Sequence, residues 1–257
     1  MARHIDAWMD GVALTNIGPI LIRQVYEDPP TLEISTGEKP GRYGQRMLQR
    51  KRQSLKVAIE CQIRELYDLP KRARIVEEMA RWASGSVLQL SNHPGRQLHV
   101  YCSGEPTLGD VRDYTSAIRM EFTADDVPFW EDKAPTRVTL SGDDEEDELM
   151  IPGTVPAPVS LTVTVSSASS AALTDFSVTV GDQTIVLDEL EIAAAGTVTF
   201  ERDARDNLMI RSGTTSLLSK RTAESADDLL AGPGVTAVSF TSDVACSVVY
   251  SVRGRWA

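Results

Sequence analysis

The feature that most constrains this chain is the strict alternation of apolar and polar residues in its hydrophobic runs. In the segment 54–64 the odd-numbered residues are all apolar, whereas Lys56, Glu60, Gln62 and Arg64 alternate with them. The apolar set is Leu55, Val57, Ile59, Cys61 and Ile63. Successive side chains of a β-strand point to opposite faces, so this pattern predicts a strand with one face on a core. Shorter runs of the same kind at 20–26, 31–35, 87–91, 97–103 and 114–122 predict a strand-rich first half.

One segment changes to the helical period. Asp68 is a suitable N-cap, Pro70 fits the first turn, and Gly85 is placed to end the helix in the left-handed conformation. Between them lies an apolar stripe formed by Ile75, Val76, Met79, Ala80, Trp82 and Ala83. The pattern predicts one amphipathic helix of about four turns.

The second half is predicted to be entirely β. Inward-facing residues are expected at Val159, Leu161, Val163 and Val165, at Phe176, Val178 and Val180, and at Val244, Cys246, Val248, Tyr250 and Val252. The run LLAGPGVTAVSF (229–240) combines a Gly-Pro-Gly turn with a further alternating strand. Short strands at roughly 10-residue spacing are typical of a β-sandwich or jelly roll.

A chain of 257 residues exceeds the usual size of one domain. Between residues 125 and 160 prolines, glycines and acids accumulate and the periodicity fades, which favours a linker. We therefore expect a first domain at 1–134, an acidic connector at 135–152 and a β-sandwich at 153–257.

The two halves of the sequence differ in net charge. The net charge is −11, and residues 1–134 hold 18 Lys and Arg against 19 Asp and Glu, whereas residues 135–257 hold 8 against 18. Because Lys and Arg supply most of the affinity for phosphate backbones, the acidic half is a poor candidate for binding nucleic acid.

The positive charges of the first half gather in the stretch GRYGQRMLQRKRQSLK (41–56). One interpretation is a nucleic-acid contact. The interpretation we favour is a long β-hairpin arm whose arginines pair with carboxylates of a neighbouring copy, because the planar guanidinium suits such interfaces. The candidate subunit-interface residues are Arg46, Arg50, Lys51 and Arg52.

The sequence predicts no catalytic, cofactor-binding or metal-binding residues. Nucleophile-elbow, phosphate-loop and dinucleotide motifs are absent, and only three histidines are present. His93, His99 and Cys102 are the one zinc candidate, but residues 99 and 102 face opposite sides of a strand. The acid run 143–148 lacks the ligand spacing of a calcium loop, so we interpret it as a solvated excursion.

Cys61, Cys102 and Cys246 lie far apart in apolar stretches and are expected to be buried free thiols. Neither a signal peptide nor a membrane-spanning run is evident, so we expect a protein made in the cytoplasm without membrane insertion.

Sugar binding by the second half would need an exposed aromatic ring. Phe176, Phe200, Phe240 and Tyr250 are in phase with the core, which leaves only Trp256 for that role.

The order of these parts resembles the distal tail protein of long-tailed (siphovirus-type) bacteriophages. The matching phrases are Asp126, Pro128 and Phe129 at the end of the first domain, the domain start at Pro158, and the Leu-x-Gly-Pro-Gly turn ending at Gly234. The resemblance spans nearly the whole chain, although the acid run lengthens the connector and no carbohydrate-binding insertion is present.

The resemblance implies a ring-forming belt domain followed by a galectin-like β-sandwich. It further implies a non-enzymatic, cofactor-free virion protein whose homohexamer ring joins the tail tube protein to the tail hub or tip protein, with receptor-binding proteins as further partners. A channel for DNA would pass through the ring. Two alternatives remain, a carbohydrate- or receptor-binding tail module and a tail-tube-like ring protein.

Overall fold

The structure is a computed structural model that describes residues 5–38, 45–64, 68–104, 106, 117–141, 146–203 and 205–257. Side chains are described throughout these ranges except at 32, 35–38, 45–52 and 69. The chain divides into two compact units, the first ending at Trp130 and the second spanning Glu131–Trp256. Within the described residues no helix has the length and hydrophobicity needed to cross a bilayer.

The first unit is an antiparallel sheet with one α-helix on its core face. Its strands lie in the order β2-β1-β7-β8-β9-β6-β3, and β4 and β5 form a separate two-stranded sheet. The elements are β1 (Ala7–Met9), β2 (Val12–Ala13), η1 (Leu14–Asn16), β3 (Ile20–Asp28), β4 (Leu32–Glu38), β5 (Gln45–Arg52), β6 (Lys56–Ile63), α1 (Leu69–Ala83), β7 (Val87–Leu90), β8 (Arg96–Gly104) and β9 (Ile118–Ala124). β10 (Trp130–Asp132) begins with the Trp130 of this unit and continues into the second.

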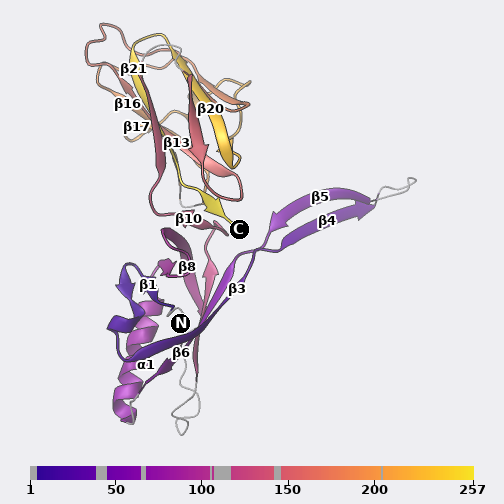
Figure 1. Ribbon diagram of the computed structural model, residues 1–257. Coiled ribbons are helices and arrows are strands. Elements are labelled where there is room, and N and C mark those ends of the chain that lie inside the picture. The colour runs from indigo at the N-terminus through magenta and orange to yellow at the C-terminus, as the bar shows by residue number, and fades with distance from the viewer. Residues whose placement is uncertain are drawn as a thin grey trace. The chain divides into compact units, whose positions relative to one another are not determined.

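The core of this unit follows the predicted alternation. All five apolar residues of the 54–64 run are buried, at 4% exposure or less, as are Met120 and Phe122 of β9. The Trp82 ring of α1 meets Phe122 edge-on at 6.2 Å, and its indole N–H donates to the carbonyl of Val12 at 2.7 Å. Figure 1 shows α1 lying along the sheet.

The helix begins as predicted and ends differently. The Asp68 side chain accepts a hydrogen bond from the backbone N–H of Lys71 at 3.3 Å, and Pro70 occupies the first turn. At the other end Ser84 keeps a right-handed backbone with φ −78°, and Gly85 has no positive φ, so the predicted left-handed stop is wrong. Glycine is needed there for space, because a Cβ at residue 85 would overlap Met9 and Asp10.

The second unit is the predicted sandwich of two antiparallel sheets. One has the order β11-β21-β13-β16-β17-β18, with β19 beside β13, and the other has the order β12-β20-β14-β15. The elements are β11 (Thr136–Ser141), β12 (Glu146–Ile151), β13 (Ala157–Val165), β14 (Phe176–Val180), β15 (Gln183–Leu187), β16 (Thr197–Arg202), β17 (Leu208–Ser212), β18 (Thr215–Ser216), η2 (Leu218–Lys220), β19 (Leu230–Ala231), β20 (Gly234–Ser242), β21 (Cys246–Val252) and β22 (Arg255–Trp256).

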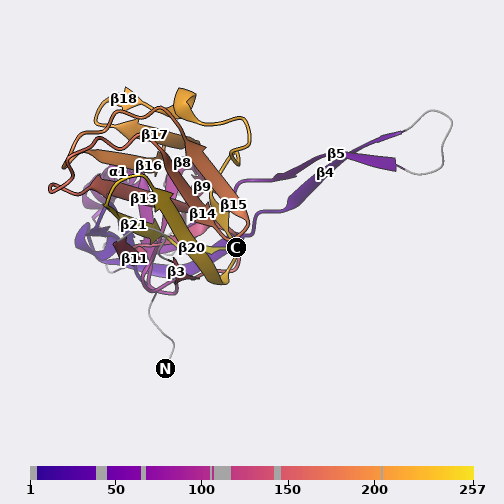
Figure 2. The same ribbon diagram turned by 90° about the horizontal axis from the view of Figure 1, so that it is seen from above.

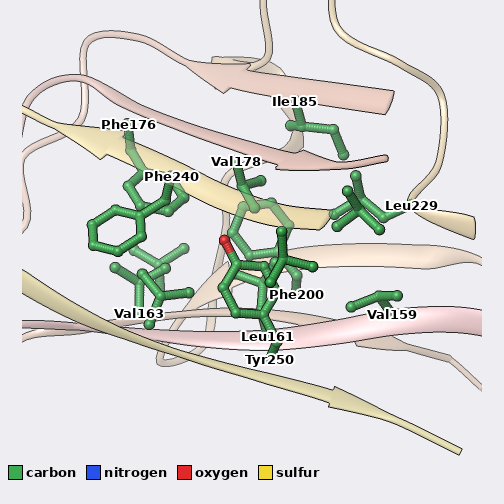
Figure 3. Close-up of a cluster of buried hydrophobic side chains, with 14 of the residues drawn as sticks. Val159, Leu161, Val163, Phe176, Val178, Ile185, Phe200, Leu229, Phe240 and Tyr250 are labelled. Carbon is green, nitrogen blue, oxygen red and sulfur yellow. The ribbon is translucent and has the colours of Figure 1, made fainter. Parts of the chain in front are cut away.

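Figure 3 shows the core between these two sheets. The Phe176 ring lies 6.2 Å from Phe240 and 6.3 Å from Phe200, and every residue predicted to face inward in this half is buried. The Tyr250 hydroxyl, on β21, donates to the carbonyl of Ser239, on β20, at 2.7 Å. The two sheets are therefore joined by a hydrogen bond as well as by apolar packing.

The segment 135–152, expected as a connector, contains two strands of the sandwich. β11 pairs with β21, and β12 pairs with β20. Both are outermost in their sheets, and β12 turns only Leu149 and Ile151 inward while Glu146, Asp147 and Glu148 are exposed. Charged edge strands discourage pairing with other chains, and that composition makes them resemble a linker.

Candidate assembly interface

The predicted arm is the most prominent candidate for contact with other chains. β4 and β5 pair with each other and, among the described strands, with no others. Figures 1 and 2 show them extending away from the body of the first unit. An exposed two-stranded ribbon has little core of its own, so contact with another surface is its natural means of stabilisation.

The four predicted interface residues all lie on β5. In the register of the hairpin Arg46 is opposite Gly37, Arg50 opposite Ile34, and Lys51 opposite Glu33, while Arg52 is opposite residue 32. The structure therefore brings them together on one strand of the arm, and their side chains lie outside the described part.

The root of the arm is formed by Asp28 and Lys56. Asp28 ends β3, Lys56 begins β6, and the two are directly opposite in the β3–β6 ladder. Next to them Thr31 Oγ1 donates to Gln53 Oε1 at 2.7 Å, and the Gln53 N–H donates to the Thr31 carbonyl at 2.9 Å. Although opposite in charge, Asp28 and Lys56 form no ion pair within 4.0 Å in the described chain.

Beside this root, the outer face of the first-unit sheet carries a polar hollow of about 430 Å³. Its floor is Ala58, which lies between Tyr26 of β3 and Glu121 of β9 in one row across the sheet. Because the Ala58 side chain is small and its two neighbours are large, the hollow lies above Ala58. The remaining lining comes from Asp28, Lys56, Val57, Ser103, Arg119, Phe122 and Thr123.

The rim of the hollow is held by polar contacts. Arg119 Nε donates to Glu121 Oε1 at 2.8 Å, and the Arg119 guanidinium lies 5.5 Å from the centre of the Tyr26 ring. The Tyr26 hydroxyl donates to Glu60 at 3.3 Å, and Thr123 donates to Ser103 at 3.0 Å. Sequence reasoning missed this hollow because its walls come from four strands that are distant along the chain.

A second polar cluster centres on Glu27. Its two carboxylate oxygens accept from the imidazole of His93 at 2.8 and 2.9 Å, and it also accepts from Asn92 at 3.1 Å and from the Trp130 indole at 3.2 Å. The His93 ring stacks on Trp130 at 4.5 Å. Burial raises the pKa of Glu27, but His93, Asn92 and Trp130 outweigh burial and hold the pKa below its ordinary value.

The zinc candidate is not assembled. His93 is bound to Glu27, His99 is exposed, and Cys102 is half-buried on β8. Over the described ranges there is no group of three His, Cys, Asp or Glu side chains placed to hold a metal ion. Of the acid run, residues 143–145 lie outside the described residues and the rest lie on β12.

The three cysteines are free, with Cys61 and Cys246 buried as expected and Cys102 only partly so. Burial, with a smaller effect from the charge of Glu60, raises the pKa of the Cys61 thiol to about 12. A thiol with so high a pKa is not ionised near neutral pH and is a poor nucleophile.

In the second unit Arg255 is buried among acids. Its guanidinium donates twice to Asp206, at 2.8 Å each, and once to Glu131 at 2.9 Å. Burial lowers the pKa of Arg255, but the two carboxylates outweigh burial and raise it. Trp256, the one ring that the sequence left as a candidate sugar platform, is half-buried and donates its indole N–H to Asp132 at 3.1 Å. It is therefore not a free platform for sugar.

The two units together define a β-rich protein of an antiparallel sheet with one helix and a hairpin arm, followed by a β-sandwich. This is the fold of the SPP1 Dit (gp 19.1) protein, described as a paradigm of the hub adsorption apparatus in phages that infect Gram-positive bacteria. The two share a TM-score of 0.70 at 13% identity over 98% of this chain and 99% of that one. The predicted likeness to a distal tail protein is thus confirmed for the fold.

Two phage P2 baseplate structures in the activated conformation also match over nearly the full length. The calcium form has a TM-score of 0.48 at 11% identity, covering 99% of this chain and 98% of that chain. The strontium form has a TM-score of 0.48 at 10% identity, covering 98% of each. No family model and no curated protein matches the sequence.

Proposed function

We propose that this chain is a structural hub protein of a bacteriophage tail, located at the distal end of the virion tail and assembled in the host cytoplasm. Its first unit would act as the belt of a homohexameric ring, and the ring would join the tail tube to the tail tip or baseplate while leaving a channel for DNA. The observation that carries the proposal is the match to SPP1 Dit over both units at once.

The site geometry supports an assembly role over a catalytic one. The arm extends from the first unit as a two-stranded ribbon, which suits contact with another chain. No cluster in the described residues combines a nucleophile, a base and an orienting partner. The proposed partners are further copies of this chain, the tail tube protein, the tail hub or tip protein and receptor-binding proteins. The net negative charge suits passage of DNA because it avoids adhesion to phosphate.

The second unit gives little support to the alternative of a carbohydrate-binding module. It has five aromatic residues, of which Phe176, Phe200, Phe240 and Tyr250 are buried at 2% exposure or less and Trp256 is half-buried. A sugar-binding site normally presents at least one open aromatic face, so we place this alternative second.

Two measurements test the proposal. Sedimentation velocity and negative-stain imaging of the purified full chain should give closed rings of six copies. Antibody-gold labelling of virions should mark the distal end of the tail. Monomers at high protein concentration, together with label elsewhere on the particle, would refute the proposal, and long filaments would favour a tail-tube-like protein.

A further inference from the structure

We infer that the polar hollow over Ala58 is a self-recognition site, into which a polar segment of a second copy of this chain docks beside Lys56 and Asp28. The inference rests on the proposed function, since ring assembly is what would bring copies together. It goes further by moving the contact from the arm itself to the sheet face at the root of the arm.

The first argument is that two charged side chains at the hollow have no partner within the described chain. Asp28 and Lys56 are adjacent, opposite in sign and exposed, and within the described chain their backbones pair but neither side chain makes a hydrogen bond or an ion pair. Around them Arg119, Glu121, Ser103 and Thr123 already satisfy one another. A pair of opposite free charges is suited to a partner that also carries both signs, as a segment of an identical chain can.

The composition of the lining excludes other classes of occupant. Carboxylates of Asp28 and Glu121 stand beside the cations, so a phosphate backbone would be repelled as much as attracted. The lining is mainly polar, which gives a lipid surface little apolar area to bury. The volume of about 430 Å³ lies within the range of sites that hold a ligand or a short chain segment.

The location favours a copy of the same chain. β3 is the last strand in the order of its sheet, so its outer edge has no paired strand within the described part of the first unit. The hollow opens next to that edge, and its lip residues Asp28 and Lys56 are the two roots of the arm. A neighbour that engages the arm or the edge would therefore lie beside the hollow.

Filling the hollow tests the inference directly. Ala58→Met places a larger side chain in the space. Ala58 is itself buried, at 8% exposure, but it points to the face that carries Tyr26 and Glu121, opposite to Val57 and Ile59, so the substitution should spare the core. We expect self-association weakened about tenfold, measured by sedimentation velocity at several concentrations, with an unchanged thermal unfolding midpoint. Ala237→Met, the same substitution at an exposed position of β20 in the second unit, is the matched control and should associate as the wild type does.

A photo-crosslinker placed at Tyr26 tests the occupant. Mixed ¹⁴N- and ¹⁵N-labelled full-length protein should give crosslinked peptides that carry both labels, because the contact joins two copies. Crosslinks within one copy only, together with normal association of the Ala58→Met variant, would overturn the inference. If the wild-type chain forms rings but both of these experiments contradict the contact at the hollow, the proposed function still holds. If the wild-type chain forms no rings, the proposed function itself is refuted.

Discussion

The carboxylate of Glu27 accepts hydrogen bonds from the imidazole of His93 on both of its oxygens, at 2.8 and 2.9 Å. This pair ties the end of β3 to the 91–95 turn, and the Trp130 indole adds a third contact from the last residue of the first unit. With Asn92, the four residues of this cluster come from three separate stretches of sequence. The cluster therefore links these three stretches of the first unit.

Glu27→Gln should destabilise the first unit by about 1–3 kcal/mol, because charge-assisted hydrogen bonds at a largely buried group become neutral ones. Urea unfolding followed by tryptophan fluorescence measures the change, since Trp130 reports on the cluster. Glu121→Gln, whose side chain is 50% exposed beside Arg119, is the control and should cost less than about 1 kcal/mol.

The same cluster predicts a dependence of stability on pH. The folded-state pKa of Glu27 lies below its ordinary value, so its contribution is complete above the unfolded-state pKa and disappears as pH falls through the folded-state value. The free energy of unfolding of the wild type should therefore decline on acidification more steeply than that of Glu27→Gln. Parallel pH profiles for the two proteins would contradict this expectation.

Tyr250→Phe should destabilise the sandwich by about 1–3 kcal/mol, because the Ser239 carbonyl loses its donor from the facing sheet. The ring itself remains, so core volume is kept. Calorimetry of the full chain should show a lower unfolding temperature for the transition of the second unit. Tyr101→Phe, at an exposed tyrosine of the first unit, should leave both transitions unchanged.

Gly153→Ala should be among the most damaging small substitutions. Gly153 has φ +123°, and a Cβ there would overlap the backbone carbonyl of Arg255, which itself accepts from the N–H of Thr154 at 2.8 Å. We expect a loss of about 3 kcal/mol or more in the free energy of unfolding. At Gly213, with φ +56° and open space around it, the same change should cost only about 1 kcal/mol.

Arg50→Glu combined with Arg52→Glu should impair ring formation and leave the folded monomer intact, since both residues lie on β5 of the arm. Light scattering coupled to gel filtration measures the assembly, and circular dichroism checks the fold. Arg211→Glu with Arg253→Glu makes the same charge change at exposed positions of the second unit. Rings that form equally well from both double variants would show that the contact is elsewhere.

Alternation was a reliable guide wherever a strand had one buried face. Val57, Ile59, Val163 and Tyr250 were all assigned to a core from parity alone, and all are buried. The same rule failed for β12, because an edge strand with three exposed acids turns only two residues inward. Its role depends on pairing with β20, which is more than 80 residues away in the sequence.

The sequence by itself determined the local periods, the N-cap at Asp68, the arm and the inward faces of the strands, because each depends on neighbours within a few residues. Only the tertiary structure decided what distant strands bring together. It placed Glu27 against His93, set Ala58 as the floor between Tyr26 and Glu121, and buried Arg255 between Glu131 and Asp206. These arrangements follow from strand order and register, which alternation constrains to a face but does not assign to a partner.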